Sequence, residues 1–192
     1  ILDGKNTIGE LDFIIEDIDT NQLLHLELAY KFYLYDPAIS DEPINNWIGP
    51  NRIDSLKEKL AKLASKQFPL LHHENAQSVL NKIDTSQTNQ ALCLLTSLFI
   101  PYGYEREFSP DFAKAIKGYY LNMETFMSLD HSDKSYHLPS KKEWGIAPET
   151  NQEWSDYNEV QDLIASALHE KQAPLCWQRH KGKYSAFFVT WW

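Results

Sequence analysis

The sequence predicts an α/β fold, with a mixed central sheet flanked by helices and an α+β C-terminal extension that ends in a β-hairpin. Three observations support this. Two strand-like segments near the N-terminus are separated by turn-forming residues, a helix-spaced segment and a continuous apolar run follow, and two alternating segments close the chain. Strands mixed with helices in this order are typical of α/β and α+β folds. We expect a core domain over 1–105 and an extension packed on it over 106–192.

An N-terminal hairpin is predicted from the strand-like segments 8–18 and 23–34. The residues between them, from Asp17 to Asn21, include Asp and Asn side chains that favour a turn. Side chains alternate across a strand, so the second segment has two faces. One face is apolar and consists of Leu24, Leu26, Leu28, Tyr30, Phe32 and Leu34. The other carries His25, Glu27, Ala29, Lys31 and Tyr33.

The rest of the chain alternates between helical and strand patterns. After a proline-marked loop over 36–50, leucines at helical spacing predict a helix of about four turns that begins near Ile53. In order, we then expect a second helix over 72–83, a buried central strand over 91–100, an interrupted helical segment over 110–127, an irregular stretch over 131–155, a helix over 157–169, and a terminal hairpin of 174–179 and 184–192.

Composition limits the functional classes. The formal net charge of -9 argues against a protein that coats nucleic acid nonspecifically, because such affinity comes mainly from neutralising phosphates. No apolar stretch approaches the roughly 20 residues of a membrane helix, so we expect a cytoplasmic protein without membrane contact. Cys93 and Cys176 lie in apolar segments without metal or redox spacing. The first residues, Ile1 to Asp3, are typical of the end of a strand, and we expect further sequence upstream.

Two acidic side chains stand out in the predicted hairpin. Glu10 and Asp12 share a face of the first strand, and Glu27 lies on the polar face of the second. If the hairpin register makes these faces coincide, Asp12 and Glu27 converge to about 5 Å apart. Two carboxylates at that separation can share one hard cation through their oxygens. The alternative is a pair of solvated carboxylates on the open face of a hairpin.

The residues around this pair resemble a nuclease motif. Gly9-Glu10-Leu11-Asp12-Phe13-Ile14 followed by Leu26-Glu27-Leu28 is similar to the core of small bacterial proteins of the PD-(D/E)XK nuclease superfamily. The blocks 9–13, 27–34 and 49–54 more closely resemble a bacterial family known as domain of unknown function 1853. The resemblance covers roughly the first half of the chain.

The resemblance implies a fold, a cofactor and a substrate. It implies a restriction-endonuclease-like sheet in αβββαβ order, with its first helix upstream of this chain. It also implies a nuclease that uses Mg²⁺ or Mn²⁺ and acts on nucleic acid, with DNA as the expected substrate. By position, Asp12 and Glu27 would be the two metal-binding acids. The backbone carbonyl of Leu28 would be a further ligand, and Glu10 is a candidate third acid.

The lysine of the superfamily motif is missing from its usual place. It should follow Glu27 by two residues, where this sequence has Ala29, and the next lysine on that face is Lys31. The Cα atoms of Glu27 and Lys31 would lie about 13 Å apart, against about 6.6 Å for the usual spacing, so an electrostatic role suits Lys31 better than a basic one. Lys59 and Gln67, on one edge of the next helix, are candidate replacements. Arg52 is a candidate phosphate-binding residue.

Two rival functions remain open. The first is a nuclease-fold protein that has lost catalysis and binds nucleic acid or a protein partner, which Ala29 and the acidic charge favour. The second is a ligand-binding or scaffold protein in which the aromatic residues, 13% of the chain, line a pocket in the second half. For His25, packing or hydrogen bonding is the more common role of such a residue. The sequence leaves the oligomeric state open.

Overall fold

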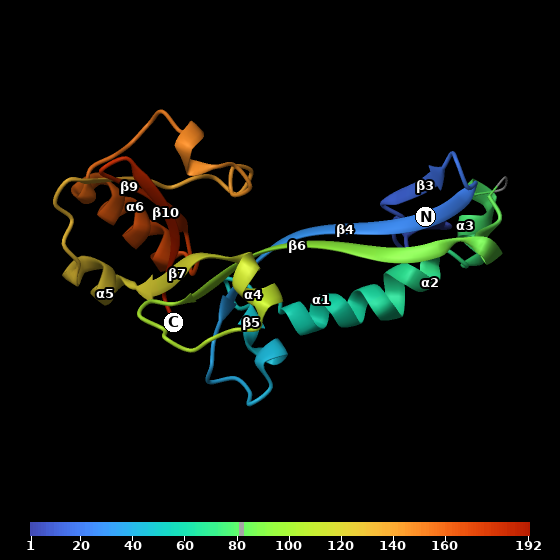
Figure 1. Cartoon of the computed structure of the whole chain (residues 1–192), viewed down its shortest axis with the longest axis horizontal. Helices are drawn as coiled ribbons and strands as arrows, with labels where there is room; N and C mark the ends of the chain where they lie inside the picture. The colour runs from blue at the N-terminus through green and yellow to red at the C-terminus, as the bar shows by residue number, and fades with distance from the viewer. Residues whose placement is uncertain (81–82) are drawn as a thin grey trace. The chain divides into compact units, whose positions relative to one another are not determined.

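The chain is described by a computed structural model that covers residues 1–80 and 83–192, and these divide into two compact units (Figure 1). Unit 1 consists of Ile1–Lys31 and Lys57–Thr96, and unit 2 consists of Phe32–Leu56 and Ser97–Trp192. Neither unit is one continuous segment of the chain. The division into domains over 1–105 and 106–192 stays a prediction.

Unit 1 combines a hairpin with a helical segment. Its elements are β1 (Leu2–Asp3), β2 (Asn6–Thr7), β3 (Phe13–Asp17), most of β4 (Gln22–Tyr35), most of α1 (Leu56–Lys62), the π-helical turn η2 (Leu63–Gln67), α2 (Phe68–Leu70), α3 (Glu74–Val79), the 3-10 turn η3 (Thr85–Gln87) and the first part of β6 (Asn89–Pro101). None of the helices in the described residues is long and apolar enough to cross a membrane.

The predicted N-terminal hairpin is confirmed. β3 and β4 pair antiparallel, with Ile14 opposite His25. The Asp17 carboxylate closes the turn, accepting hydrogen bonds from the backbone N–H groups of Asp19 at 2.9 Å and Thr20 at 3.1 Å. Asn21 has a φ of 55°, a left-handed conformation that Asn tolerates better than most residues. Local turn chemistry therefore fixes the register of this hairpin.

One face of β4 is covered by the helical segment that runs from α1 through η2 to α2. This is the helix predicted to begin near Ile53, and within unit 1 it runs along β4 and β6 (Figure 1). The covered face is the polar one, with His25 and Glu27 only 0% and 1% exposed. On the apolar face, Leu28 and Tyr30 are 42% and 48% exposed. Alternation identified the two faces of the strand but not which of them is buried.

The second predicted helix, over 72–83, corresponds to the shorter helix α3. The side chain of His73 caps it, because its Nδ1 accepts a hydrogen bond from the Asn75 backbone N–H at 3.2 Å. Asn81 and Lys82, near the end of the predicted range, lie outside the described residues.

Unit 2 contains the larger part of the sheet. Its elements include the 3-10 turn η1 (Pro43–Asn46), β5 (Trp47–Ile48), α4 (Pro110–Ala115), β7 (Ile116–Asn122), α5 (Met123–Ser128), β8 (Lys134–His137), the 3-10 turn η4 (Pro148–Thr150), α6 (Tyr157–His169), β9 (Leu175–His180) and β10 (Lys183–Thr190). Strands follow the order β3-β4-β6-β7-β10-β9-β8, with β5 paired to β4. Because β7 runs parallel to β6 and β10 while β9 runs antiparallel, the predicted mixed sheet flanked by helices is confirmed.

The predicted helical segment over 110–127 is wrong in its middle. Helices α4 and α5 form at its two ends, but the residues between them form strand β7, which lies between β6 and β10. A Cβ atom at Gly118 would lie 1.9 Å from the Ala186 carbonyl oxygen on β10, so only glycine lets the two strands come this close. The glycine that suggested an interrupted helix instead marks a close approach between strands.

The end of the chain follows the sequence patterns more closely. Helix α6 has the predicted bounds, and the predicted terminal hairpin is formed by β9 and β10. The stretch expected to be irregular, 131–155, contains the short strand β8 paired with β9. Buried side chains from β7, α5, α6, β9 and β10 form the main core of this unit: Leu121, Phe126, Val160, Ile164, Cys176, Phe187 and Val189.

Candidate acidic site in unit 1

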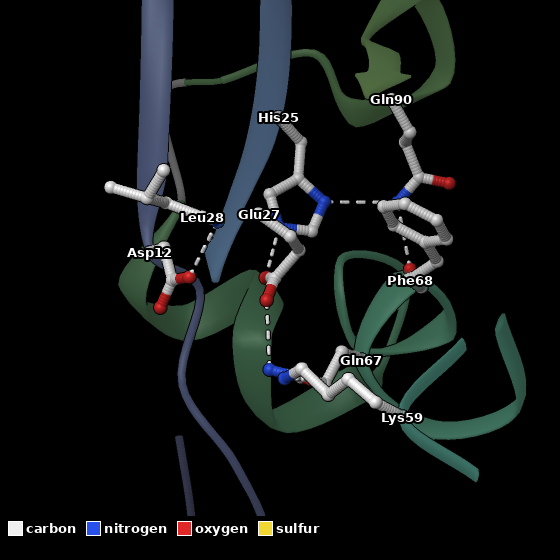
Figure 2. Close-up of polar contacts among 8 residues, drawn as sticks. All are labelled: Asp12, His25, Glu27, Leu28, Lys59, Gln67, Phe68 and Gln90. Atoms are coloured by element: carbon white, nitrogen blue, oxygen red, sulfur yellow. Dashed lines mark hydrogen bonds and ion pairs between the residues drawn. The ribbon is translucent and has the colours of Figure 1, made fainter. Parts of the chain in front are cut away.

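The two predicted metal-binding acids occupy facing positions on neighbouring strands. Phe13 is opposite Leu26 in the β3–β4 ladder, so Asp12, one residue earlier, comes opposite Glu27. The ladder itself begins at Phe13, so Asp12 lies just before the paired residues. The Asp12 carboxylate is half-exposed, and its Oδ2 accepts a hydrogen bond from the Leu28 backbone N–H at 2.8 Å (Figure 2). Asp12 is thereby held next to the strand position of Glu27.

The Glu27 carboxylate is buried and engaged at both oxygens. Its Oε1 lies 2.8 Å from His25 Nε2, and its Oε2 accepts a hydrogen bond from Gln67 Nε2 at 2.7 Å (Figure 2). The residue is 1% exposed. A buried carboxylate is costly unless it is paired with a charge, hydrogen-bonded or bound to a metal. The contacts with His25 and Gln67 supply hydrogen bonds. Whether they also balance the negative charge of Glu27 depends on the charge of these two partners.

The state of His25 follows from Gln90. The Gln90 Nε2 atom donates to the Phe68 carbonyl oxygen at 2.8 Å and lies 3.0 Å from His25 Nδ1. An amide NH₂ group only donates, so His25 Nδ1 accepts and carries no hydrogen. The remaining proton of the ring is on Nε2 and is donated to Glu27. His25 is therefore neutral in this network, and its predicted role as a hydrogen-bonded imidazole is confirmed.

The negative charge of Glu27 is thus met by neutral groups. Its two hydrogen-bond partners are the His25 imidazole and the Gln67 amide, and both are neutral. Hydrogen bonds from neutral donors stabilise the ionised form but do not cancel its charge. Both oxygens of Glu27 are thus occupied by hydrogen-bond donors.

The helical segment brings Gln67 and Lys59 to this carboxylate through an irregular turn. In a regular α-helix, residues eight apart differ by about 80° in direction. The wider π-turn from Leu63 to Gln67 holds an extra residue, which turns the later part of the helix back by roughly 100°. Lys59 and Gln67 then share one side, and Lys59 Nζ lies 3.4 Å from Gln67 Oε1. Both predicted helix candidates join the network, although their functional roles stay predictions.

The remaining candidates in unit 1 are Lys31, Glu10 and the Leu28 carbonyl, together with position 29 of the motif. Ala29 is 7% exposed and offers no proton-transfer group at the usual lysine position. Lys31 is half-buried and four residues beyond Glu27 on the same strand face, and Glu10 is exposed. In the described part of the chain, no group of three or more His, Cys, Asp and Glu side chains is arranged to hold a metal ion. The metal roles of Glu10 and of the Leu28 carbonyl stay predictions.

Arg52 lies in unit 2, where it already has two partners. Its Nη1 lies 3.0 Å from Asp36 Oδ2, and its guanidinium carbon lies 4.5 Å from the centre of the Trp192 ring. The φ of Arg52 is 56°, in a turn where the Gly49 backbone N–H bonds to the Asp54 carbonyl oxygen at 2.7 Å. These contacts hold the loop over 49–54 in place. A phosphate-binding role for Arg52 stays a prediction.

An aromatic-lined cavity of about 340 Å³ lies in unit 2. Its lining includes Tyr35, Trp47, Tyr104 and Phe108. The indole Nε1 of Trp47 is buried and has no hydrogen-bond partner among the described residues. The rival hypothesis of a ligand-binding protein with an aromatic pocket would place the ligand in this cavity. That function stays a prediction.

Comparison with known proteins identifies the family. The family model described as "Domain of unknown function (DUF1853)" matches residues 1–186. The chain belongs to this family. Searches of curated proteins and of solved structures found no match. The DUF1853 match extends the resemblance from the first half of the sequence to nearly all of it.

Sequence reasoning missed part of this DUF1853 site. Gln90, which fixes the hydrogen-bonding state of His25, lies 65 residues away from it in the chain. Lys62 and Lys66 line a cavity next to Gln67 and were not singled out. A polar residue just before an apolar strand was the one signal for Gln90. The two lysines had no signal beyond their place in a helix that also carries Lys59.

Proposed function

We propose that this chain is a metal-dependent phosphodiesterase of the PD-(D/E)XK type that cleaves nucleic acid in the cytoplasm. The observation that carries the proposal is the buried Glu27 carboxylate, which receives hydrogen bonds from neutral groups and faces the position of Asp12. A bound metal ion is one of the ways in which a protein stabilises a buried carboxylate. The sequence resemblance supports the same two residues.

The donor set suits Mg²⁺ or Mn²⁺. Mg²⁺ prefers oxygen ligands, keeps several waters and is commonly bound through one or two carboxylates. Asp12, Glu27 and the Leu28 carbonyl offer that set, with Glu10 as a further acid. When bound, such a metal would supply an activated water and stabilise charge that develops on the phosphate.

The protein's own residues would position the carboxylates and the substrate. His25 and Gln67 hold the Glu27 carboxylate in one orientation, and the Leu28 backbone N–H holds that of Asp12. Lys59 reaches Gln67 from the helix, so it is the lysine best placed to take the electrostatic role of the missing strand lysine. Lys31 would act on phosphate from farther along the strand.

The second candidate is a nuclease-fold protein that binds nucleic acid or a protein partner without cleaving it. Two observations favour it. Position 29 holds a buried alanine, and both oxygens of Glu27 are already engaged, so a metal ion would have to share or replace the Gln67 contact. Both candidates use the same fold and differ in whether a phosphodiester bond is broken.

Cleavage assays separate the two candidates. The full chain would be incubated with single-stranded, duplex and branched DNA and with RNA, in Mg²⁺, Mn²⁺ or EDTA. We expect metal-dependent cleavage that Asp12→Asn slows by at least about a hundredfold, because that change removes a metal-binding charge. Asp19→Asn, in the exposed turn of the same hairpin, is the matched control. Equal background cleavage by all three proteins, with no metal binding in calorimetry, would reject the enzyme and favour the second candidate.

A further inference from the structure

A cavity of about 330 Å³ opens beside the acidic site within unit 1. One wall is the chain that leads into β3, including Gly9 and Glu10, and the other is the helical segment with Lys62, Lys66 and Gln67. A Cβ atom at Gly9 would lie 2.7 Å from Leu70 Cδ2, so glycine allows the chain to pass close to α2. The chain at Gly9 therefore packs directly against the Leu70 side chain.

Two lysines and one glutamate line this cavity, so its charged side chains are positive on balance. Lys62 and Lys66 are both exposed, and neither forms an ion pair within the described residues. They are four residues apart on one helical segment, a spacing at which like charges repel. An anion between the two ammonium groups would turn this repulsion into attraction. The chain as a whole is acidic, with a formal net charge of -9, so the positive charge of these two lysines is local to the cavity.

The cavity connects to the acidic pair through one side chain. Gln67 lines the cavity and donates its amide hydrogen bond to Glu27. Glu10, the candidate third acid, lines the same cavity. The Gln67 side-chain amide would thus lie between an anion held by the lysines and the Glu27 carboxylate. A phosphate next to a metal-binding carboxylate needs this combination of cationic and acidic groups.

We infer that this cavity binds a backbone phosphate of a nucleic-acid strand, with Lys62 and Lys66 as its cationic contacts. The inference rests on the proposed function, because it places the strand next to the groups that would cleave it. Lys62 and Lys66 are positioning residues in this account. Their task is to hold the phosphate that neighbours the bond to be cleaved.

Salt-dependent binding of the full chain tests the inference. Fluorescence anisotropy would follow a labelled single strand of about 20 nucleotides in EDTA, from 50 to 200 mM salt. The variant is Lys62→Gln with Lys66→Gln. The matched control is Lys5→Gln with Lys57→Gln, which removes the same charge at exposed lysines of unit 1 outside the cavity. Inorganic phosphate as competitor shows whether free phosphate occupies the same site.

The expected result is a smaller salt dependence for the cavity variant. Two lost phosphate contacts lower the slope of log K against log salt by about 1.4, so the wild type should lose about sevenfold more affinity over this range than the variant. The control should keep the wild-type slope. Equal slopes in the cavity and control variants would overturn the inference, as would a wild type that binds no strand.

The binding and cleavage measurements together show whether the phosphate site, the nuclease activity or both are absent. A reduced slope together with absent cleavage would support the phosphate site and reject the enzyme. Metal-dependent cleavage in which the cavity variant changes neither the slope nor KM would support the enzyme and reject the phosphate site.

Discussion

At position 27, two neighbouring hydrogen-bond donors require a side chain that accepts hydrogen bonds. His25 and Gln67 both donate hydrogen bonds, so the residue between them must accept at both ends. An ionised carboxylate does this, while an amide has a donor at one end. These two donors make an ionised carboxylate at position 27 structurally necessary, whether or not it also binds the proposed metal. The hydrogen-bond network alone therefore favours glutamate over glutamine at this position.

The variant Glu27→Gln tests this reasoning despite its nearly identical shape. We expect it to lower the free energy of unfolding by about 1–3 kcal/mol, because its NH₂ group would face a buried donor. Urea unfolding in EDTA gives the value, and Glu10→Gln, at an exposed position, should change it by less than about 0.5 kcal/mol. Mn²⁺ should raise the unfolding temperature of the wild type and leave Glu27→Gln unchanged. An unaltered unfolding free energy in Glu27→Gln would contradict the hydrogen-bond assignment.

A second residue-scale prediction concerns His131, which lies between α5 and β8. Burial lowers the pKa of this imidazole. Its Nε2 donates to the Phe126 carbonyl oxygen at 2.9 Å, its Nδ1 lies 2.7 Å from the Tyr136 hydroxyl, and its ring stacks on Tyr157. These contacts suit a neutral ring with Tyr136 donating to Nδ1.

The sign of the pH effect follows from that lowered pKa. Below about pH 6.5 the unfolded chain binds a proton at position 131 that the folded chain resists, so stability falls as the pH drops toward the folded-state pKa. We expect the unfolding temperature to fall more between pH 7.5 and 5.5 in the wild type than in His131→Gln, which cannot titrate. Equal decreases in the two proteins would show that His131 does not contribute.

At the scale of elements, patterns carried by neighbouring residues were predicted correctly and those set by distant partners were not. The β3–β4 hairpin and α6 depend on local turn and helix signals, and both were found. β7 was missed because its parallel partner β10 lies near the end of the chain. For the site, strand alternation identified the face of β4 that carries His25 and Glu27. The role of Gln90 and the cavity at Lys62 depend on packing between separate segments, which local sequence patterns do not specify.

Strand β7 provides a sharp element-scale prediction. Gly118→Ala should prevent normal pairing with β10, because the added methyl group would meet the Ala186 carbonyl oxygen. We expect the variant to be insoluble or to lose more than about 3 kcal/mol of unfolding free energy. Gly103→Ala is the matched control. Its Cβ would meet no atom within 4 Å, although its φ of 74° predicts a cost of about 1 kcal/mol. Similar losses in both variants would contradict the close approach.

At the scale of the whole molecule, the two compact units share the chain in an interleaved way. β4 and β6 each contribute residues to both units, and unit 2 uses 32–56 as well as everything after Thr96. Leu98 and Phe99, each 1% exposed, lie on the part of β6 that pairs with β7. A cut after residue 105 would remove that partner strand.

A fragment of residues 1–105 tests whether the predicted core domain is independent. We expect it to aggregate or to bind an apolar dye, because the cut would expose the buried side chains at the end of β6. Size-exclusion chromatography and dye fluorescence, with the full chain as reference, give the answer. A monomeric fragment that unfolds cooperatively would instead support 1–105 as an autonomous domain.

The π-turn η2 has a consequence for aligning this chain with its relatives. It amounts to one inserted residue between Lys62 and Phe68. A relative with a regular α-helix here would be one residue shorter, and its counterpart of Gln67 would follow its counterpart of Lys59 by seven positions. An ungapped alignment would then pair Gln67 with the wrong residue and hide the amide that bonds to Glu27. Placing the gap within Leu63–Gln67 restores the match, so the helix geometry tells the aligner where the insertion belongs.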